Sequence, residues 1–212
     1  MMPRRNDRQA ILLADLMPTL SGLDWARRCP VDALALDSRD VEAGGLWLAL
    51  QGGRQHALEH LDEARDRGAV AVLAEPAGSW DRERIGSLNR SVPVIAVPGL
   101  RRQAGEIAGR FFGQAAMAMR VAGVTGTNGK TSVAHFLAQA LSTRVATAVL
   151  GTVGNGFPGQ LEASSHTTSD AVRLHSLLAD LFRRGARAVA MEVSSHALDQ
   201  ARVAGVPFHT AV

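Results

Sequence analysis

Short apolar runs alternate with polar stretches of helical spacing through the first hundred residues of this chain. Continuous apolar runs bounded by turn residues predict buried strands, at 46–50, 69–75 and 92–98. A helix is predicted over 56–67, with Gly68 as its C-terminal cap. The polar stretch between Pro76 and the third run is predicted to be a loop. Apolar strands separated by a helix indicate an α/β unit with a covered sheet.

The second half of the chain repeats this alternation. Strands are predicted at MRVAGV (119–124), 144–151, 186–193 and VPFHTAV (206–212). Helices are predicted at 101–113, 131–141 and 171–184. The second of these helices carries an apolar stripe of the kind that faces a core, made of Val133, Phe136, Leu137, Ala140 and Leu141. Ser169-Asp170 is predicted to cap the third helix, and NGFPGQ (155–160) is predicted to form a turn.

These elements predict two α/β domains, over 1–100 and 101–212, with the helix at 101–113 as their connection. The second domain stops on an apolar strand. Because such a strand needs a neighbour and a covering helix, we expect the chain to be a truncated piece of a longer protein.

A glycine-rich loop joins the strand predicted at 119–124 to the helix after it. The loop reads Gly126, Thr127, Asn128, Gly129, Lys130, Thr131 and Ser132. Backbone N–H groups of such a turn point at phosphate oxygens, and the helix adds the positive end of its dipole. Lys130 is placed to reach the β- and γ-phosphates of ATP, and the Thr131 hydroxyl to ligate Mg²⁺. The spacing is tighter than the common G-x-x-x-x-G-K-[ST], because Val124 stands five residues before Gly129.

Lysine use also singles out this loop. Of the 23 basic residues, only Lys130 is a lysine. A compact ammonium on a flexible stem suits phosphate oxygens in a way that a planar guanidinium does not. A structural turn without a ligand is therefore the weaker interpretation of the loop.

Glu192 is the candidate carboxylate for the metal ion. It lies near the C-terminal end of the apolar strand predicted at 186–193, the edge at which open parallel sheets bind ligands. An ionised glutamate in a buried strand is costly unless it is paired or bound to a metal. The alternative is a carboxylate that meets an arginine at the surface.

Several segments resemble the Mur ligases: GVTGTNGKTS, HTTSD, MEVSSHALDQARV and DSRDVEAGGLWLALQG. The resemblance implies a small N-terminal α/β UDP-binding domain and an incomplete P-loop parallel-sheet ATPase domain, and a C-terminal amino-acid-binding domain that this chain lacks. It implies the addition of meso-diaminopimelate or L-lysine to UDP-N-acetylmuramoyl-L-alanyl-D-glutamate through an acyl phosphate, in peptidoglycan precursor synthesis. ATP and Mg²⁺ are the implied cofactors, and the muramoyl dipeptide and a diamino acid the implied partners. The chain alone is expected to bind nucleotide without completing the ligation.

Matched position by position, the resemblance implies the site residues. Catalytic roles fall to Lys130, Thr131 and Glu192, of which Thr131 and Glu192 would hold Mg²⁺. ATP would be bound by Gly126 through Ser132. The UDP part would be contacted by Ser38, Gly53, Arg54 and Gln55. The muramoyl peptide would be held by Thr167, Thr168, Ser194, Gln200 and Arg202. His56-Ala57 stand where the family has Asp-Gly.

Composition argues against several other classes of protein. The net charge is only +3, and the arginines are interspersed with acids instead of gathered with aromatics, which argues against nucleic acid. No apolar run approaches the roughly 18–20 residues of a membrane span, so we expect a cytoplasmic protein. We also expect a monomer. A single Cys29 forbids an internal disulfide. The histidines show no zinc-ligand spacing, and His196 is interpreted as structural.

Alternative functions stay open. Within the same class, the chain could belong to another Mur ligase or to a folylpolyglutamate-synthase-like ligase, which shares the glycine loop. From another class, it could be a P-loop regulatory NTPase, although no switch signature is found, or a non-catalytic nucleotide-binding module.

Overall fold

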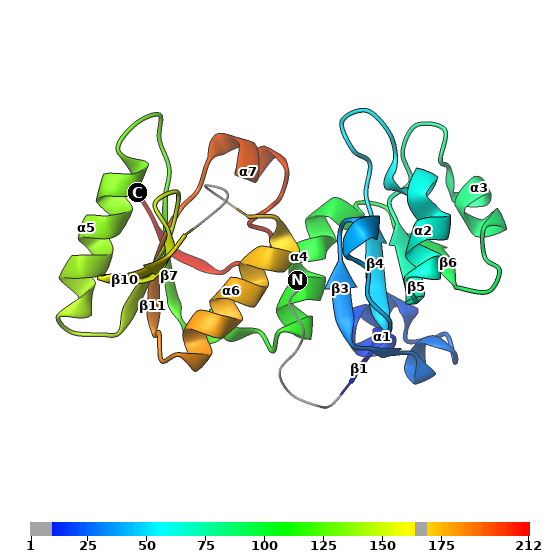
Figure 1. Cartoon of the computed structure of the whole chain (residues 1–212), viewed down its shortest axis with the longest axis horizontal. Coiled ribbons are helices and arrows are strands. Elements are labelled where there is room, and N and C mark those ends of the chain that lie inside the picture. The colour runs from blue at the N-terminus through cyan, green and yellow to red at the C-terminus, as the bar shows by residue number, and fades with distance from the viewer. Residues whose placement is uncertain (1–9, 164–168) are drawn as a thin grey trace. The chain divides into compact units, whose positions relative to one another are not determined.

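A computed structural model describes residues 10–163 and 169–212 of the chain. The chain divides into two compact units, Met1–Phe111 and Phe112–Val212 (Figure 1). The division falls at the end of helix α4 (Leu100–Phe111) instead of at its start, where the domain boundary was expected. The reason lies in the contacts of α4 with the first unit, where the Arg101 N–H donates to Glu75 Oε1 and Arg110 Nη1 donates to the Leu16 carbonyl oxygen.

The first unit is built on a four-stranded parallel sheet in the order β3-β4-β5-β6. Its strands are β3 (Ala33–Ala35), β4 (Gly45–Ala49), β5 (Ala69–Ala74) and β6 (Val94–Ala96). Two short strands pair antiparallel beside it, β1 (Ile11–Leu12) and β2 (Pro30–Val31). Besides α4, its helices are α1 (Leu13–Leu16), α2 (Leu61–Asp66) and α3 (Arg82–Ser87). Its 3-10 helices are η1 (Pro18–Leu20), η2 (Ala26–Arg28), η3 (Ser38–Asp40) and η4 (Ala57–His60).

In this unit, the elements with many buried residues could be predicted from the sequence, and an element with one buried residue could not. Every residue of β4 is buried, and Trp47 at its centre is fully enclosed, as expected of a strand covered on both faces. Helix α3 lies in the stretch predicted to be a loop. It forms because the Asp81 carboxylate caps it by accepting from the Arg84 N–H, while Ile85 is its single buried residue. One buried position gives no periodic signal.

The second unit contains a six-stranded sheet in the order β10-β9-β8-β11-β7-β12. The parallel strands are β7 (Arg120–Val124), β8 (Thr147–Leu150), β11 (Ala188–Glu192) and β12 (Phe208–Ala211). The antiparallel strands are β9 (Asn155–Phe157) and β10 (Gln160–Glu162). The helices are α5 (Lys130–Ser142), α6 (Ala171–Arg183), α7 (Ser195–Asp199) and the 3-10 helix η5 (Ala115–Ala118). The α/β class is thereby confirmed, but the sheet is mixed.

The antiparallel hairpin corrects the prediction of a simple turn at 155–160. Both strands are only three residues long. Gly154 and Gly156 adopt φ values of 159° and 142°, and a Cβ on either would collide with backbone oxygen of the opposite strand. Glycine is therefore needed for the close approach of the two strands, and its presence hid their strand character.

Helices α5 and α6 cover opposite faces of the second sheet (Figure 1). Along β8 and β11 the side chains alternate, so that Val149 and Ala190 meet α5 while Ala148 and Val189 pack with α6. The predicted cap of α6 is confirmed, because the Asp170 carboxylate accepts from the N–H of the residue three positions later.

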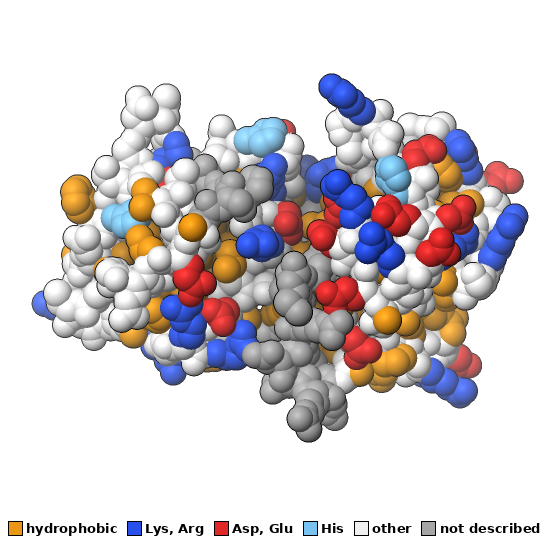
Figure 2. Space-filling view, in the orientation of Figure 1, with side chains coloured by type: hydrophobic (Ala, Val, Ile, Leu, Met, Phe, Trp, Pro, Cys, Tyr) orange, Lys and Arg blue, Asp and Glu red, His pale blue; other side chains and the backbone are white. Residues whose placement is uncertain are grey.

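The apolar stripe predicted on α5 is partly wrong in its direction, although its Leu137 packs against the core cluster under the helix. Ala134 and Ala138 are fully buried against the sheet, whereas Phe136 is 68% exposed and Val133 is 38% exposed. Hydrophobic side chains accordingly reach the surface over this helix (Figure 2). Alanines on the inner face let the helix lie close to the sheet. Among the described residues, no helix combines the length and apolar character needed to cross a membrane.

Candidate functional site

The glycine loop lies where β7 ends and α5 begins. Gly126 and Gly129 have φ values of 136° and 79°, in the left-handed region that favours glycine. Gly129 is also the N-cap of α5, and it makes no side-chain capping bond. The N–H groups of the first helical turn, which have no partner within a helix, therefore face the loop. This arrangement suits phosphate oxygens.

Lys130 lies over the same loop. Its Nζ donates to the carbonyl oxygen of Gly126 at 2.8 Å and is 3.5 Å from that of Thr127. The ammonium is exposed, so a polyanion can reach it from solvent. The loop, the helix end and the ammonium thus come together as the sequence predicts.

Glu192 ends β11 and is only 1% exposed. Its Oε2 accepts from the hydroxyl of Thr131 at 3.0 Å. The same oxygen accepts from the Thr152 hydroxyl at 3.0 Å, and Oε1 accepts from the Thr152 backbone N–H at 2.9 Å. These bonds from neutral donors compensate the cost of burying the carboxylate.

Strand pairing brings these groups to one edge of the sheet. Glu192 lies opposite Val124 of β7, and the residue before it lies opposite Leu150 of β8. All three strands are parallel, so the glycine loop, Thr152 and Glu192 follow three adjacent carboxyl ends. Thr152 was not among the site residues predicted from the sequence. The available signal was a Gly-Thr pair directly after an apolar strand.

Thr131 and Glu192 fit a hard divalent cation. A hydroxyl oxygen and a carboxylate oxygen lie 3.0 Å apart, and both are donors that Mg²⁺ prefers. No group of three or more His, Cys, Asp or Glu side chains that could hold a metal ion exists within 10–163 and 169–212. Two protein ligands are compatible with Mg²⁺, because it keeps several waters and shares phosphate oxygens.

The residues expected to hold the muramoyl peptide form two local groups near α7. Ser194 caps this helix, since its Oγ accepts from the Ala197 N–H at 3.1 Å. Gln200 Oε1 accepts from Arg202 Nε at 2.9 Å and Nη2 at 2.7 Å, and Gln200 Nε2 lies 2.8 Å from His196 Nε2. The amide therefore fixes the direction of the guanidinium. Thr167 and Thr168 lie outside the described residues.

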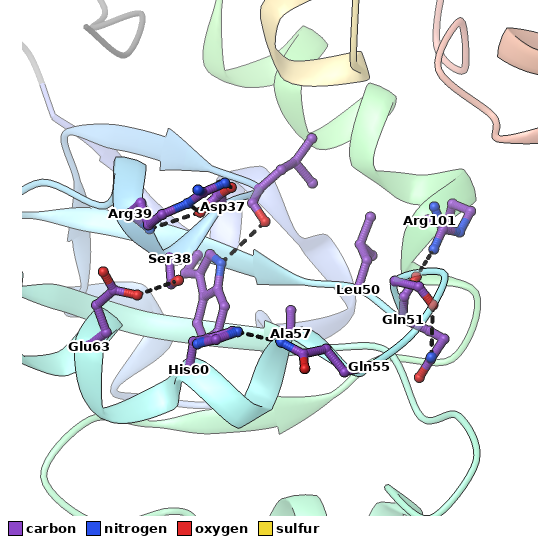
Figure 3. Close-up of a pocket in the computed structure, with 13 residues that line it drawn as sticks. Asp37, Ser38, Arg39, Leu50, Gln51, Gln55, Ala57, His60, Glu63 and Arg101 are labelled. Carbon is purple, nitrogen blue, oxygen red and sulfur yellow. Dashed lines mark hydrogen bonds and ion pairs between the residues drawn. The ribbon is translucent and has the colours of Figure 1, made fainter.

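A pocket of about 450 Å³ opens in the first unit, where β3 and β4 end (Figure 3). Ser38 and Gln55, which the resemblance implies as contacts to UDP, both line it. Gly53 and Arg54 are exposed on the neighbouring loop and are not lining residues. Additional lining residues that the sequence analysis did not select include Asp37, Arg39, Trp47, His60, Glu63 and Arg101.

Polar contacts order this pocket. The Ser38 hydroxyl donates to Glu63 Oε2 at 2.8 Å, and Gln55 Nε2 lies 2.7 Å from His60 Nε2 (Figure 3). The Arg39 guanidinium hydrogen-bonds the Asp37 carboxylate and lowers the pKa of that carboxyl. The pocket thus offers acceptors and donors suited to a polar ligand such as a nucleotide base.

His56, which departs from the family pattern, is structural. It is 3% exposed, and its Nδ1 accepts from the Leu58 N–H at 3.1 Å. Its Nε2 lies 2.7 Å from the Glu75 carbonyl oxygen. Both ring nitrogens are therefore used inside the first unit, next to the pocket-lining Gln55.

Comparison with known proteins agrees with this geometry. Residues 124–212 match the Mur ligase middle domain. A UDP-N-acetylmuramoyl-L-alanyl-D-glutamate--2,6-diaminopimelate ligase from Alkalilimnicola ehrlichii is 53% identical over 201 residues, which cover 93% of this chain and 40% of that relative. The ligase of the same name from Pseudomonas aeruginosa is 49% identical over 181 residues, covering 84% of this chain and 36% of the relative.

A solved structure of a ligase with the same name is similar along most of the chain. The match has a TM-score of 0.79 and 31% identity, and it covers 96% of this chain and 40% of the solved chain. The chain thus spans about 40% of the length of these relatives.

Proposed function

Because the chain belongs to the Mur ligase family, we propose that it supplies the nucleotide-binding part of an ATP-dependent ligase of peptidoglycan precursor synthesis. The substrate is UDP-N-acetylmuramoyl-L-alanyl-D-glutamate, and the added amino acid is meso-diaminopimelate. The names of the relatives support diaminopimelate over L-lysine. The observation that carries the proposal is the contact between Thr131 and Glu192 beside the glycine loop.

In the proposed reaction, the loop amides and Lys130 bind the triphosphate of ATP. Thr131 and Glu192 would hold Mg²⁺, which would supply positive charge to neutralise the phosphates. The carboxylate of the UDP-linked substrate attacks the γ-phosphorus, and the bond to ADP breaks. The amine of the diamino acid then attacks the acyl carbon, loses a proton and expels inorganic phosphate. Gln200 and Arg202 would orient the muramoyl peptide, since a guanidinium can fork onto a carboxylate.

In the first unit, the pocket around Ser38 and Gln55 would hold the UDP part of the substrate. Its position after parallel strands supports this assignment, because ligands collect at such edges. A folate-modifying ligase would have no need of a uridine pocket. Thermal shift with UDP-N-acetylmuramoyl dipeptide and with folates therefore separates these two candidates, and stabilisation by folates alone would contradict the proposal.

Calorimetric titration with Mg²⁺ and a non-hydrolysable ATP analogue tests the nucleotide site. We expect Lys130→Ala to weaken binding about 10- to 100-fold, because it removes charge-assisted hydrogen bonds worth about 1.5–3 kcal/mol. Arg144→Ala is the matched control, since it removes an exposed cation beyond the other end of α5. If the wild-type chain ignores the analogue at millimolar concentration, the assignment fails.

A further inference from the structure

Thr152 makes two of the hydrogen bonds that surround the buried carboxylate of Glu192. The backbone N–H of Thr152 donates to Oε1 at 2.9 Å, and its hydroxyl donates to Oε2 at 3.0 Å. Thr152, in the loop after β8, therefore donates hydrogen bonds to both carboxylate oxygens of Glu192. The third bond comes from Thr131 on α5 and reaches Oε2 at 3.0 Å.

The Glu192 carboxylate is also closely packed against the backbone of the loop after β8. Gly151 lies so close that a Cβ there would be 2.1 Å from Oε1. Glu192 has three side-chain torsions, so its carboxylate could rotate unless neighbouring groups hold it. The residue is only 1% exposed, so bulk water does not supply hydrogen bonds to this carboxylate. Oε2 thus accepts from the hydroxyls of Thr152 and Thr131, while Oε1 accepts from the Thr152 backbone N–H.

We propose that Thr152 is a positioning residue for Glu192, holding the carboxylate in the orientation that meets Thr131 beside the glycine loop. This inference rests on the proposed function, in which Thr131 and Glu192 bind the divalent cation of the nucleotide. Partners that orient a metal ligand contribute strongly to metal affinity, and their loss costs about 10- to 100-fold. The role of Thr152 is to act through Glu192, with no contact to the nucleotide required.

Two substitutions separate the hydroxyl from the rest of the residue. Thr152→Val keeps the shape and the backbone N–H but removes the hydroxyl bond to Oε2. Thr152→Ser keeps the hydroxyl and is the matched control. Binding of the ATP analogue is measured by calorimetry over a range of Mg²⁺ concentrations and also in excess chelator.

With Thr152→Val, the Mg²⁺ concentration for half-maximal tight binding should rise about 10- to 100-fold, while the metal-free affinity stays at the wild-type value. Thr152→Ser should restore wild-type Mg²⁺ dependence. An unchanged Mg²⁺ dependence in the valine variant overturns the inference, as does an equal loss of affinity with and without metal. If the valine variant does not fold, Thr152→Ala is measured and judged by the same criteria.

The wild-type titration separates this inference from the proposed function. Absence of any binding by wild-type protein refutes the nucleotide site itself. Normal wild-type binding together with an unaffected valine variant refutes only the role of Thr152.

Discussion

Gly151 offers a direct test of how tightly the Glu192 carboxylate is fixed. A Cβ at this position would lie 2.1 Å from Oε1 and 2.8 Å from Cδ of Glu192. The φ of Gly151 is not among the positive ones, so alanine causes no backbone strain there. In Gly151→Ala the carboxylate must therefore move, and the bond from the Thr152 N–H to Oε1 is the first to break.

The expected cost follows from that bond and from the crowding. A hydrogen bond to a charged group contributes about 1.5–3 kcal/mol, and overpacking a tight site costs about 1–3 kcal/mol. We therefore expect the free energy of unfolding to fall by at least about 1.5 kcal/mol. Each kcal/mol shifts Tm by about 2–8 °C, depending on whether the two units unfold together or separately. The Tm should drop by at least about 3 °C, and Mg²⁺-dependent nucleotide binding should weaken as well.

Differential scanning calorimetry measures the shift, and Gly86→Ala serves as the control. Gly86 lies within α3, and a Cβ there would meet no atom within 4 Å. Alanine at that helical site should raise stability by about 0.5–1 kcal/mol. If Gly151→Ala unfolds at the wild-type temperature and binds nucleotide with wild-type affinity, the carboxylate is not held as described.

Two further predictions concern other contacts. Ser38→Ala should weaken UDP binding about 2- to 10-fold, since one hydrogen bond contributes about 0.5–1.5 kcal/mol. Glu63→Ala should weaken UDP binding through the same hydroxyl, because Glu63 accepts its hydrogen bond. Calorimetry on the double variant tests this coupling, and additive losses of affinity would contradict it. Burial lowers the pKa of His175 despite its bond to the Ala204 carbonyl. The unfolded chain then protonates this histidine more readily than the folded chain does. The contribution of His175 to the free energy of unfolding is therefore fully present above pH ~6.5, and below that pH the free energy of unfolding falls by at most about 1.4 kcal/mol per pH unit. His175→Gln should lack this part of the slope in denaturant titrations, and an identical slope would refute the assignment.

The nucleotide loop and Glu192 could be predicted because their signals are local. Two glycines, a lysine and a threonine stand within six consecutive positions, and Glu192 ends an apolar run that is typical of a strand. Thr152 could not be predicted in the same way. Its partner is 40 residues away in the sequence, and the contact depends on β8 pairing in parallel with β11. Only the register of the sheet brings the two residues together.

The pocket in the first unit also combines residues that could be selected from the sequence with a residue that only the fold brings there. Ser38 follows β3 and Gln55 follows β4, and the resemblance to a family selected both as candidates. Glu63 lies on α2, where a carboxylate among other charged residues is typical of a solvated helix face. Its bond to Ser38 depends on α2 packing over the end of β3. Sequence spacing does not encode that packing.

Helix α5 shows why an apolar stripe can point to the wrong side. The spacing of Val133, Phe136 and Ala140 fixes an angle around the helix, but it does not say which surface the helix meets. Against a sheet, the side that packs is the one that permits the closest approach. Ala134 and Ala138 stand four residues apart and are both fully buried, and Leu137 packs against the same core cluster, so these three residues define that side. Small residues contribute little to a hydrophobicity pattern, and for this reason the larger side chains on the outer face dominated the prediction.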